Sequence, residues 1–438
     1  MREMKDSGIK WVNKIPVGWK VARLKDVIQM LTDYTANGSF GDLAKNVQYL
    51  DYEDYARLIR LTDLRENLEN SGVYVSEYSY DYLAKSSLYG GEILVANVGA
   101  YAGLFCEMPP INMPSTLGPN MFLIRTNPKM LQHYLYYLGN ADFVWKQLVQ
   151  KAMSSAQPKL NKTDVKTTYI IIPPVQEQKR IANFLDAKCA EIDSLTADIQ
   201  TQIDTLEQYK RSVITEAVTK GLNPDVEMKD SGTPWCPLIP IHWKYANPKA
   251  LFTQRLDRAY PGDKQLTASQ EYGVIYQDEY MELTGTKIVT VMKDFSILKH
   301  VEPNDFVISM RSFQGGLEYS ERRGSISSAY VMLIPNNEYV YPPFYRWFFK
   351  SSKYINAIQS TSNLVRDGQA MRYANFAQVP LFIIPLDEQK QISEYLDEKV
   401  RKIDEILKSK KSQLEILAEY KKSLIYEYVT GKKEVPAI

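Results

Sequence analysis

The sequence predicts an α+β protein built as a tandem repeat, in which two mixed α/β domains are each followed by a long helix and the two helices form an antiparallel coiled coil. Three observations carry this prediction. Two segments of the 438-residue chain recur in both halves, two long runs have heptad spacing, and the intervening segments alternate short apolar runs with turn residues. The chain is also too long for one ordinary domain.

The repeated segments define the frame of the duplication. Residues 4–20 and 228–244 are identical at 10 of 17 positions, and the segments that begin at Glu177 and Glu388 share 18 of 44 ungapped positions. The first pair of segments shares Trp11/Trp235, Pro16/Pro240 and Trp19/Trp243. The offset falls from 224 to 211 residues between the two pairs, so the second domain is about 13 residues shorter than the first.

Between these segments, apolar runs bounded by Gly, Ser and Asn predict strands and helices. The expected strands are Glu92–Val98, Met121–Arg125, Thr168–Ile172, Asp305–Met310, Ala329–Ile334 and Leu381–Ile384, and the expected helices are Pro128–Lys151 and Pro342–Gln359. The frame repeats whereas the domain interiors differ. This pattern favours two similar modules that read different things.

Each long helix begins just after proline residues and is expected to end at Gly221 or Gly431. A helix of roughly 44 residues is about 65 Å long, and its narrow apolar stripe is typical of a coiled coil. The expected seam residues are Leu185, Ile192, Leu195, Ile199, Leu206, Leu396, Ile403, Ile406, Leu417 and Leu424. The chain order favours antiparallel pairing. Gln202 and Gln413, near the helix midpoints, either meet in the seam and fix its register or are both solvated.

The expected boundaries follow from these elements. They are a first domain at 1–175, a helix at 176–220, a linker at 221–234, a second domain at 235–386, a helix at 387–431 and a tail at 432–438.

Composition narrows the class of function. No window of about 18 uncharged apolar residues is present, so no membrane span is expected. The three cysteines and three histidines are scattered, which argues against a His/Cys metal site and indicates a reducing, cytoplasmic setting. The net charge of +1 is low for a protein that binds DNA alone, and it predicts localised basic patches or a more basic partner.

One fragment of the sequence resembles a catalytic motif but lacks the residues that the motif requires. Tyr341-Pro-Pro-Phe344 resembles the motif of amino-methyltransferases, but tyrosine cannot replace the polar residue that binds the target amino group, and no glycine-rich cofactor loop precedes it. A helix that starts with proline explains this fragment better. We therefore expect no catalytic, cofactor-binding or metal-binding residue on this chain.

Several motifs together resemble the specificity subunit of type I restriction–modification enzymes. They are MKDSG followed by W and IPxxW, a Leu-Asn-Lys segment leading to apolar-Pro-Pro, and EQK opening a long helix that ends in Tyr-Lys-Arg-Ser. Ser155–Lys162 resembles the family's segment before the first long helix, and Ser309–Gly316 resembles a strand and turn of its recognition domains. The resemblance covers nearly the whole chain.

The resemblance implies a function. Each domain would be a target recognition domain that reads one half of a split, asymmetric site in double-stranded DNA, and the paired helices would set the spacer. The helices would also dock two adenine-methyltransferase subunits that bind S-adenosylmethionine. Restriction subunits would add ATP- and Mg-dependent translocation and cleavage, so this chain would carry no cofactor and no catalytic activity of its own.

Polar loop residues whose side chains pair with purine edges or phosphates are the candidate DNA contacts. They are Arg60, Asn97, Gln157, Lys159, Arg311, Gln314, Arg366, Gln369 and Arg372. For each of them, a surface residue without a DNA contact is an equally open alternative, and Arg60 and Asn97 have a further alternative as local structural partners. Two other functions are weighed against this one. A coiled-coil adaptor that binds only proteins would leave the two diverged domains unexplained, and a self-sufficient methyltransferase would need the missing cofactor loop.

Overall fold

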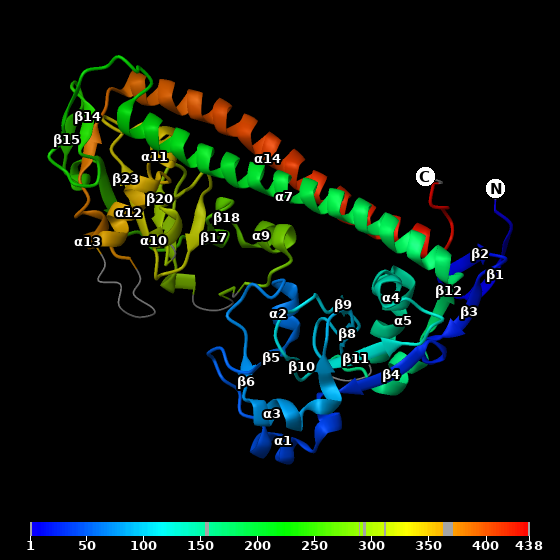
Figure 1. Cartoon of the computed structure of the whole chain (residues 1–438). Coiled ribbons are helices and arrows are strands. Elements are labelled where there is room, and N and C mark those ends of the chain that lie inside the picture. Colours follow the sequence, from blue (N-terminus) through cyan, green and yellow to red (C-terminus); the bar gives the residue numbers. More distant parts are fainter. Residues whose placement is uncertain are drawn as a thin grey trace. The chain divides into compact units, whose positions relative to one another are not determined.

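The computed structural model describes residues 2–153, 157–288, 290–291, 295–310, 312–361 and 371–436. The chain divides into two compact units: unit 1 contains Met1–Ile199 and Gln413–Ile438, and unit 2 contains Gln200–Ser412. The two long helices are shared between the units. Helix α7 (Val175–Lys220) begins in unit 1 and ends in unit 2, whereas α14 (Leu386–Val429) begins in unit 2 and ends in unit 1 (Figure 1).

Unit 1 opens with an antiparallel hairpin and a short two-stranded sheet, and a four-stranded antiparallel sheet follows. The hairpin is β1 (Met4–Ile9) and β2 (Val12–Pro16), and the short sheet pairs β3 (Lys20–Arg23) with β12 (Tyr169–Ile172). The four-stranded sheet has the order β4 (Ile28–Asp33), β11 (Met121–Thr126), β8 (Ile93–Ala96), β9 (Phe105–Glu107). Helices α4 (Gln132–Gly139), α5 (Asp142–Ala152) and α6 (Lys162–Lys166) complete this frame. Its core joins the strands, α4, α5 and both long helices.

A second four-stranded sheet belongs to unit 1 alone. Its order is β6 (Tyr74–Val75), β5 (Ala56–Ile59), β10 (Ser115–Leu117), β7 (Ser87–Leu88), with β5 and β10 parallel. Helices α1 (Phe40–Asn46), α2 (Leu61–Arg65) and α3 (Glu77–Tyr82) accompany it. It packs around its own apolar clusters, which include Leu58, Val75 and Leu117.

Unit 2 repeats the frame of unit 1, strand for strand. The hairpin is β13 (Met228–Asp230) and β14 (Leu238–Pro240), and the short sheet pairs β15 (Lys244–Ala246) with β24 (Leu381–Ile383). The four-stranded sheet has the order β16 (Phe252–Arg255), β23 (Val331–Pro335), β20 (Phe306–Ile308), β21 (Glu318–Tyr319). The helices are α8 (Pro248–Leu251), α10 (Ser312–Gly315), α11 (Pro342–Phe348), α12 (Ser352–Ser360) and α13 (Tyr373–Phe376).

The remainder of unit 2 differs from unit 1. Two separate two-stranded sheets take the place of the second four-stranded sheet, and α9 (Gln277–Thr284) follows the first of them. The sheets pair β17 (Leu266–Ser269) with β18 (Gly273–Tyr276) and β19 (Lys299–Val301) with β22 (Gly324–Ile326). Single-turn 3₁₀ helices occur at Leu24–Asp26, Tyr34–Asn37, Ala84–Ser86 and Phe295–Ile297. The duplication predicted from the sequence is thus a repeated frame that carries different inserts.

The two shorter helices expected from the sequence are each broken in two. Pro128–Lys151 becomes α4 and α5, and Pro342–Gln359 becomes α11 and α12. In unit 1 the break falls at Asn140, whose side chain accepts a hydrogen bond from the Phe105 N–H and donates one to the Phe105 carbonyl (3.2 and 2.9 Å). These bonds to strand β9 replace a continuation of the helix, which the apolar pattern alone does not reveal.

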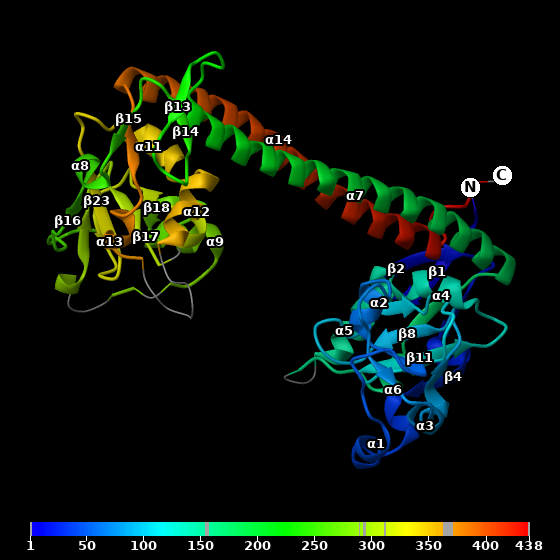
Figure 2. The ribbon, with the colours of Figure 1, turned by 60° about the vertical axis from the view of Figure 1, so that its left-hand side comes forward.

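The long helices pack against each other in both units and run antiparallel in each (Figures 1 and 2). In unit 1, Lys421 pairs with Asp193 at 2.6 Å, and the ring of Phe184 lies 4.5 Å from that of Tyr428. In unit 2, Lys210 pairs with Asp404 at 2.6 Å, and Lys411 with Glu207 at 3.4 Å. As the residue number rises along α7, the number of the residue opposite it on α14 therefore falls, as antiparallel packing requires.

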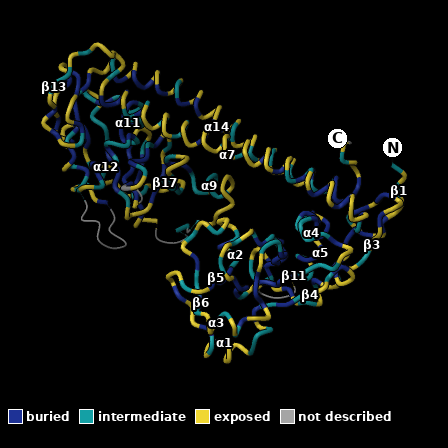
Figure 3. Tube along the Cα trace, viewed as in Figure 1, coloured by how far each residue is buried: buried dark blue, intermediate teal, exposed yellow. Residues whose placement is uncertain are grey.

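Burial along α7 and α14 alternates with a heptad period (Figure 3) and corrects the predicted seam at two positions. Leu185, Ile192, Leu396, Ile403 and Leu424 are buried as predicted, and Ile199, Leu206 and Leu417 are half-buried. Leu195 and Ile406, however, are 49% and 46% exposed, and the residues that follow them, Thr196 and Leu407 (7%), take their places in the seam. Ile203 (3%) is a further buried residue of the seam. The seam therefore contains Thr196 and not Leu195, so one of its positions is a threonine although a leucine stands next to it in the sequence. Gln202 and Gln413 are both exposed, which favours the solvated alternative.

Each helix is anchored to its domain by the same pair of residues. In unit 1, the Trp19 indole N–H donates to Glu177 (2.9 Å), and in unit 2 the Trp243 indole N–H donates to Glu388 (3.0 Å). The next residue, Gln178 or Gln389, bonds the backbone just before α4 or α11, accepting from the N–H of Leu131 or Tyr341. The repeated Trp and Glu-Gln residues are therefore anchor points of the frame.

The far ends of the helices also meet equivalent surfaces. Gly221 follows directly after α7, and an added Cβ there would lie 3.8 Å from the ring of Trp243. Gly431 lies two residues after α14, and an added Cβ there would lie 3.0 Å from the ring of Trp19. Both glycines have positive φ, +76° and +70°, which is the left-handed conformation that ends many helices. Among the described residues, no helix combines the length and the apolar composition that crossing a membrane requires.

Candidate nucleic-acid interface

Some of the predicted DNA contacts lie on two segments at equivalent places of the repeated sheets. Strands β8 and β20 occupy the same place in the two repeated sheets. The loop 97–104 follows β8 in unit 1, and a segment that contains α10 follows β20 in unit 2. Asn97 begins the loop of unit 1, and Gln314 lies in α10. Loops held by a rigid sheet are a common place for binding residues.

Three of the predicted residues of unit 1 come together. Val98 and Lys159 form an isolated β-bridge, and the Leu160 N–H donates to the Asn97 carbonyl at 2.8 Å. Gln157 lies two residues before Lys159, and both are exposed. The Asn97 side-chain oxygen is buried with no hydrogen-bond partner among the described residues, so the loop carries an unsatisfied acceptor.

Arg60 has a structural partner within unit 1. Its guanidinium binds Asp63 through two hydrogen bonds of 3.0 and 2.7 Å, at the N-terminus of α2. Asp63 is fully buried; burial raises the pKa of its carboxyl, but the hydrogen bonds from Arg60 and Asn70 outweigh that effect and hold the pKa below its ordinary value. This geometry favours the local structural role that the sequence left open.

Only two of the DNA contacts predicted in unit 2 lie among the described residues. Arg311, Arg366 and Gln369 lie outside the described residues. Gln314 is exposed in α10, and Arg372 is exposed at the start of α13, where its backbone N–H donates to Asn375 Oδ1 at 3.0 Å. The two described residues stand on separate elements.

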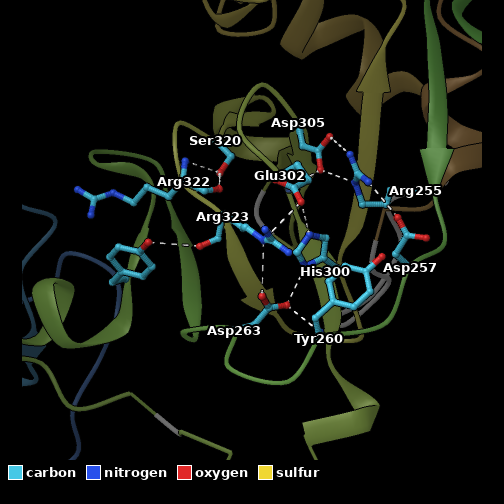
Figure 4. A network of polar contacts seen from close by, with 11 residues as sticks. Arg255, Asp257, Tyr260, Asp263, His300, Glu302, Asp305, Ser320, Arg322 and Arg323 are labelled. Atoms are coloured by element: carbon cyan, nitrogen blue, oxygen red, sulfur yellow. Dashed lines mark hydrogen bonds and ion pairs between the residues drawn. The ribbon is translucent and has the colours of Figure 1, made fainter.

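A polar network in unit 2 escaped prediction from the sequence (Figure 4). The buried His300 ring lies between two carboxylates, with Nδ1 2.7 Å from Asp263 and Nε2 2.8 Å from Glu302. Arg323, whose side chain is 60% exposed, approaches Glu302 at 3.5 Å and points over the ring of Tyr260. The buried His300 and its two carboxylate partners thus support Arg323 and Tyr260, which are exposed.

The same network extends to the edge of the repeated sheet. Arg255 binds the buried Asp305 through Nε and Nη2 at 2.6 and 2.9 Å, and it also contacts Asp257. Burial raises the pKa of Asp305, and Arg255 opposes that rise. Because the partners are 50 residues apart in the chain and follow no motif, only the tertiary structure brings them together.

A second pair of braces joins each domain to its helix. In unit 1, Asp186 of α7 lies 2.7 Å from His133 and accepts from the Tyr137 hydroxyl at 2.7 Å. The equivalent Asp397 of α14 binds Arg346 and accepts from the Trp347 indole at 2.7 Å. The aspartates are repeated in the sequence, but their partners are not, so only half of each brace could be found from the repeat.

The described residues contain no group of three or more His, Cys, Asp or Glu side chains placed to hold a metal ion. Burial raises the pKa of the Cys106 and Cys236 thiols to about 11, which makes them poor nucleophiles. Pro342 occupies the first turn of α11 and Tyr341 precedes it, as expected for a helix start.

The fold and these loops define a class: a duplicated protein with two recognition-type domains on one repeated frame and two paired helices. Residues 16–205 match the family model of the type I restriction modification DNA specificity domain. The chain is similar to the specificity subunits of type I restriction–modification systems, by the family model over residues 16–205 and by sequence over nearly its whole length.

Curated relatives span nearly the whole chain. It is 24% identical to a putative type I restriction enzyme MjaX specificity subunit from Methanocaldococcus jannaschii, over 97% of this chain and 96% of that protein. It is 21% identical to the type I restriction enzyme EcoBI specificity subunit from Escherichia coli, over 92% of this chain and 86% of that protein.

Solved structures share the fold. A chain from a study of complex assembly and conformational transition of a type I R-M system superposes with a TM-score of 0.68 at 16% identity, covering 96% of this chain and 99% of that one. The HsdS subunit from Thermoanaerobacter tengcongensis gives 0.51 at 15% identity, covering 96% and 98%. The predicted fold class is confirmed.

Proposed function

We propose that each domain of this chain reads one half of a bipartite, asymmetric DNA site. One observation carries the proposal: the two repeated sheets are equivalent in strand order, while the inserts built on them differ. A four-stranded sheet in unit 1 and two small sheets in unit 2 would present different side chains to DNA from the same frame. Two different half-sites require such an arrangement, whereas an adaptor for one protein partner does not.

The two helices are proposed to set the spacer between the half-sites. Helix α7 continues without a break from unit 1 into unit 2, and its 46 residues correspond to about 69 Å of helix. The ion pairs on either side of the seam fix the register of α7 against α14. A continuous pair of helices in fixed register is a suitable ruler.

Two adenine-methyltransferase subunits are proposed to dock on these helices. Leu195 and Tyr420 of unit 1 are exposed, and so are their repeat counterparts Ile406 and Tyr209 of unit 2. Exposed apolar side chains at repeated positions support one kind of partner bound twice. The partners would hold S-adenosylmethionine, and restriction subunits would use ATP and Mg. Because such a complex acts on the host's DNA, we propose a cytoplasmic location.

Methylation-site mapping with the reconstituted methyltransferase complex tests this function. Removing one matched heptad from each helix shortens the pair by about 10 Å, or about three base pairs of DNA. We expect the mapped site to keep both half-sites while the spacer becomes shorter. An unchanged spacer in a complex that still methylates would disprove the ruler, and methylation without a bipartite site would disprove the reading of two half-sites.

The matched control deletes nothing but replaces the same number of exposed helix residues by alanine. It is expected to leave the spacer unchanged, which separates the effect of length from that of helix composition.

A further inference from the structure

Arg65 and Tyr101 form an exposed pair in unit 1 that sequence reasoning did not single out. Arg65 is the last residue of α2, and its guanidinium carbon lies 4.3 Å from the centre of the Tyr101 ring. This is the shortest cation–ring contact in the described part of the chain. Tyr101 is 44% exposed, and Arg65 is exposed as well. The pair therefore faces solvent.

Arg65 differs from other arginines of unit 1 in its ion pairing. Three other arginines of unit 1 have side-chain partners. Arg60 binds Asp63, Arg57 donates to Asn70, and Arg125 pairs with Glu92. Arg65, by contrast, has no ion pair among the described residues. Stacking on a ring occupies the face of the guanidinium and leaves the N–H donors in its plane available. A ligand with two adjacent acceptors can bind them.

The loop that carries Tyr101 is held in place on both sides. The Gly99 N–H donates to the Pro158 carbonyl (2.9 Å), and the Gly103 N–H donates to the Ala96 carbonyl (2.8 Å). Gly99 and Gly103 have φ values of +88° and +98°, which other residues rarely adopt. The same loop bridges to Lys159, so a second exposed cation lies on the segment beside it.

Helix α2 is fixed as firmly as the loop. Asp63 accepts from Arg60 and Asn70, and its carbonyl accepts from the Leu68 N–H at 2.8 Å. Asn67 and Leu68 both have positive φ, a conformation that this network stabilises. Arg65 is thus positioned before any ligand arrives, which reduces the entropy cost of binding.

We propose that Arg65, stacked on Tyr101, is a DNA contact of the first domain. Its ligand is a planar pair of acceptors, which DNA offers either as guanine O6 and N7 or as phosphate oxygens. This inference rests on the proposed function and adds the residue that performs it. The position supports it: Tyr101 lies in the loop after β8, and α10, which follows β20 at the equivalent place of unit 2, carries Gln314.

The test uses the full chain in complex with its methyltransferase subunits and duplexes that contain the mapped site. R65A is expected to weaken binding about 10- to 100-fold. R65K keeps the charge but not the fork, so it should recover only part of that loss. Y101F retains the ring and should bind like the wild type, whereas Y101A should resemble R65A.

Arg23 provides the matched control. It also stacks on an exposed tyrosine, Tyr169, at 5.4 Å, but it belongs to the short sheet of β3 and β12 in the frame. R23A is expected to bind DNA like the wild type. Thermal unfolding of each variant checks that the fold is intact.

Duplexes changed one base pair at a time separate the two sources of acceptors. If R65A loses discrimination at one base pair of one half-site, the ligand is guanine. If R65A weakens all duplexes equally and lowers the salt dependence, the ligand is phosphate. Wild-type affinity and discrimination in a folded R65A variant would overturn the inference. Failure of the proposed function looks different, because then the wild-type complex itself would show no preference for a bipartite site.

Discussion

At the scale of single residues, His133 predicts a dependence of stability on pH. The hydrogen bond with Glu107 raises the pKa of His133 from 6.5 to about 9, burial opposes this rise, and Asp186 adds to it. Because the folded-state pKa is the higher one, the contribution to stability is fully present below about pH 6.5 and is lost as the pH rises through about 9. The imidazole is partly exposed, so solvent screening keeps the effect modest.

Thermal unfolding from pH 6 to pH 10 measures this effect. H133Q should flatten the decline of the melting temperature between pH 7 and pH 9.5. The equivalent contact of unit 2 uses the guanidinium of Arg346 in place of an imidazole, so R346Q should shift the melting temperature equally at every pH. An identical pH profile for wild type and H133Q would contradict the prediction.

Two glycines with positive φ, Gly431 after α14 and Gly8 in β1, predict a difference between two similar substitutions. Gly431 and Gly8 have φ values of +70° and +68°, but a Cβ on Gly431 would lie 2.5 Å from Pro16, whereas one on Gly8 meets nothing within 4 Å. G8A should lower the free energy of unfolding by about 1 kcal/mol from backbone strain alone. G431A should lower it by a further 1–3 kcal/mol or so, because the joint with Pro16 must also shift. Urea unfolding measures the free energy of unfolding of both variants. Equal losses of free energy would show that the contact of Gly431 with Pro16 adjusts to the added methyl group without cost.

At this scale the sequence revealed residues that the repeat preserves and missed those that it does not. Trp19 and Trp243 were visible because both copies keep them. His300 and Arg323 were invisible, since their partners follow no motif and are assembled only by the fold. Arg65 was overlooked because nothing in the sequence indicates that Tyr101 lies against it.

At the scale of elements, the corrected seam predicts that two apolar residues of α7 have different roles. I203A removes a buried seam residue and should cost about 2–4 kcal/mol of unfolding free energy. The double variant L195A/I406A removes exposed side chains and should change stability by less than about 0.5 kcal/mol. It should instead weaken binding of the methyltransferase subunits. Chemical denaturation and titration with those subunits measure the two effects, and a stability loss in L195A/I406A equal to that of I203A would contradict the corrected seam.

The long helices were predictable because a heptad stripe without Gly or Pro permits few other structures. The breaks in the two shorter helices were not. A side chain such as Asn140 ends a helix only where a strand offers it partners, and that strand is 35 residues away in the chain. The seam was misplaced at Leu195 for a related reason, since apolar residues lie on both the seam and the exposed flank.

At the scale of the whole molecule, the duplication was the most predictable feature and the inserts the least. Ungapped repeats at both ends of each domain established two copies of one frame. The second sheet of unit 1 and the paired strands of unit 2 share no pattern, so their topology required the structure. Divergent segments are also the parts expected to differ between readers of different DNA.

The equivalent joints at Gly221 and Gly431 make the order of the segments interchangeable. In unit 2 the chain passes directly from α7 to the hairpin, and Gly221 lies beside Trp243. In unit 1 Gly431 lies beside Trp19 and Pro16, and the Tyr426 hydroxyl donates to the Trp11 carbonyl. Each long helix thus ends beside the repeated tryptophan of the unit in which it ends. A circular permutant that begins at Asn223, with the original ends joined by a flexible Gly/Ser linker, should fold to the same stability and recognise the same site with its half-sites in the same order. Methylation mapping of the permutant checks this, and a loss of folding would show that the two joints are not equivalent.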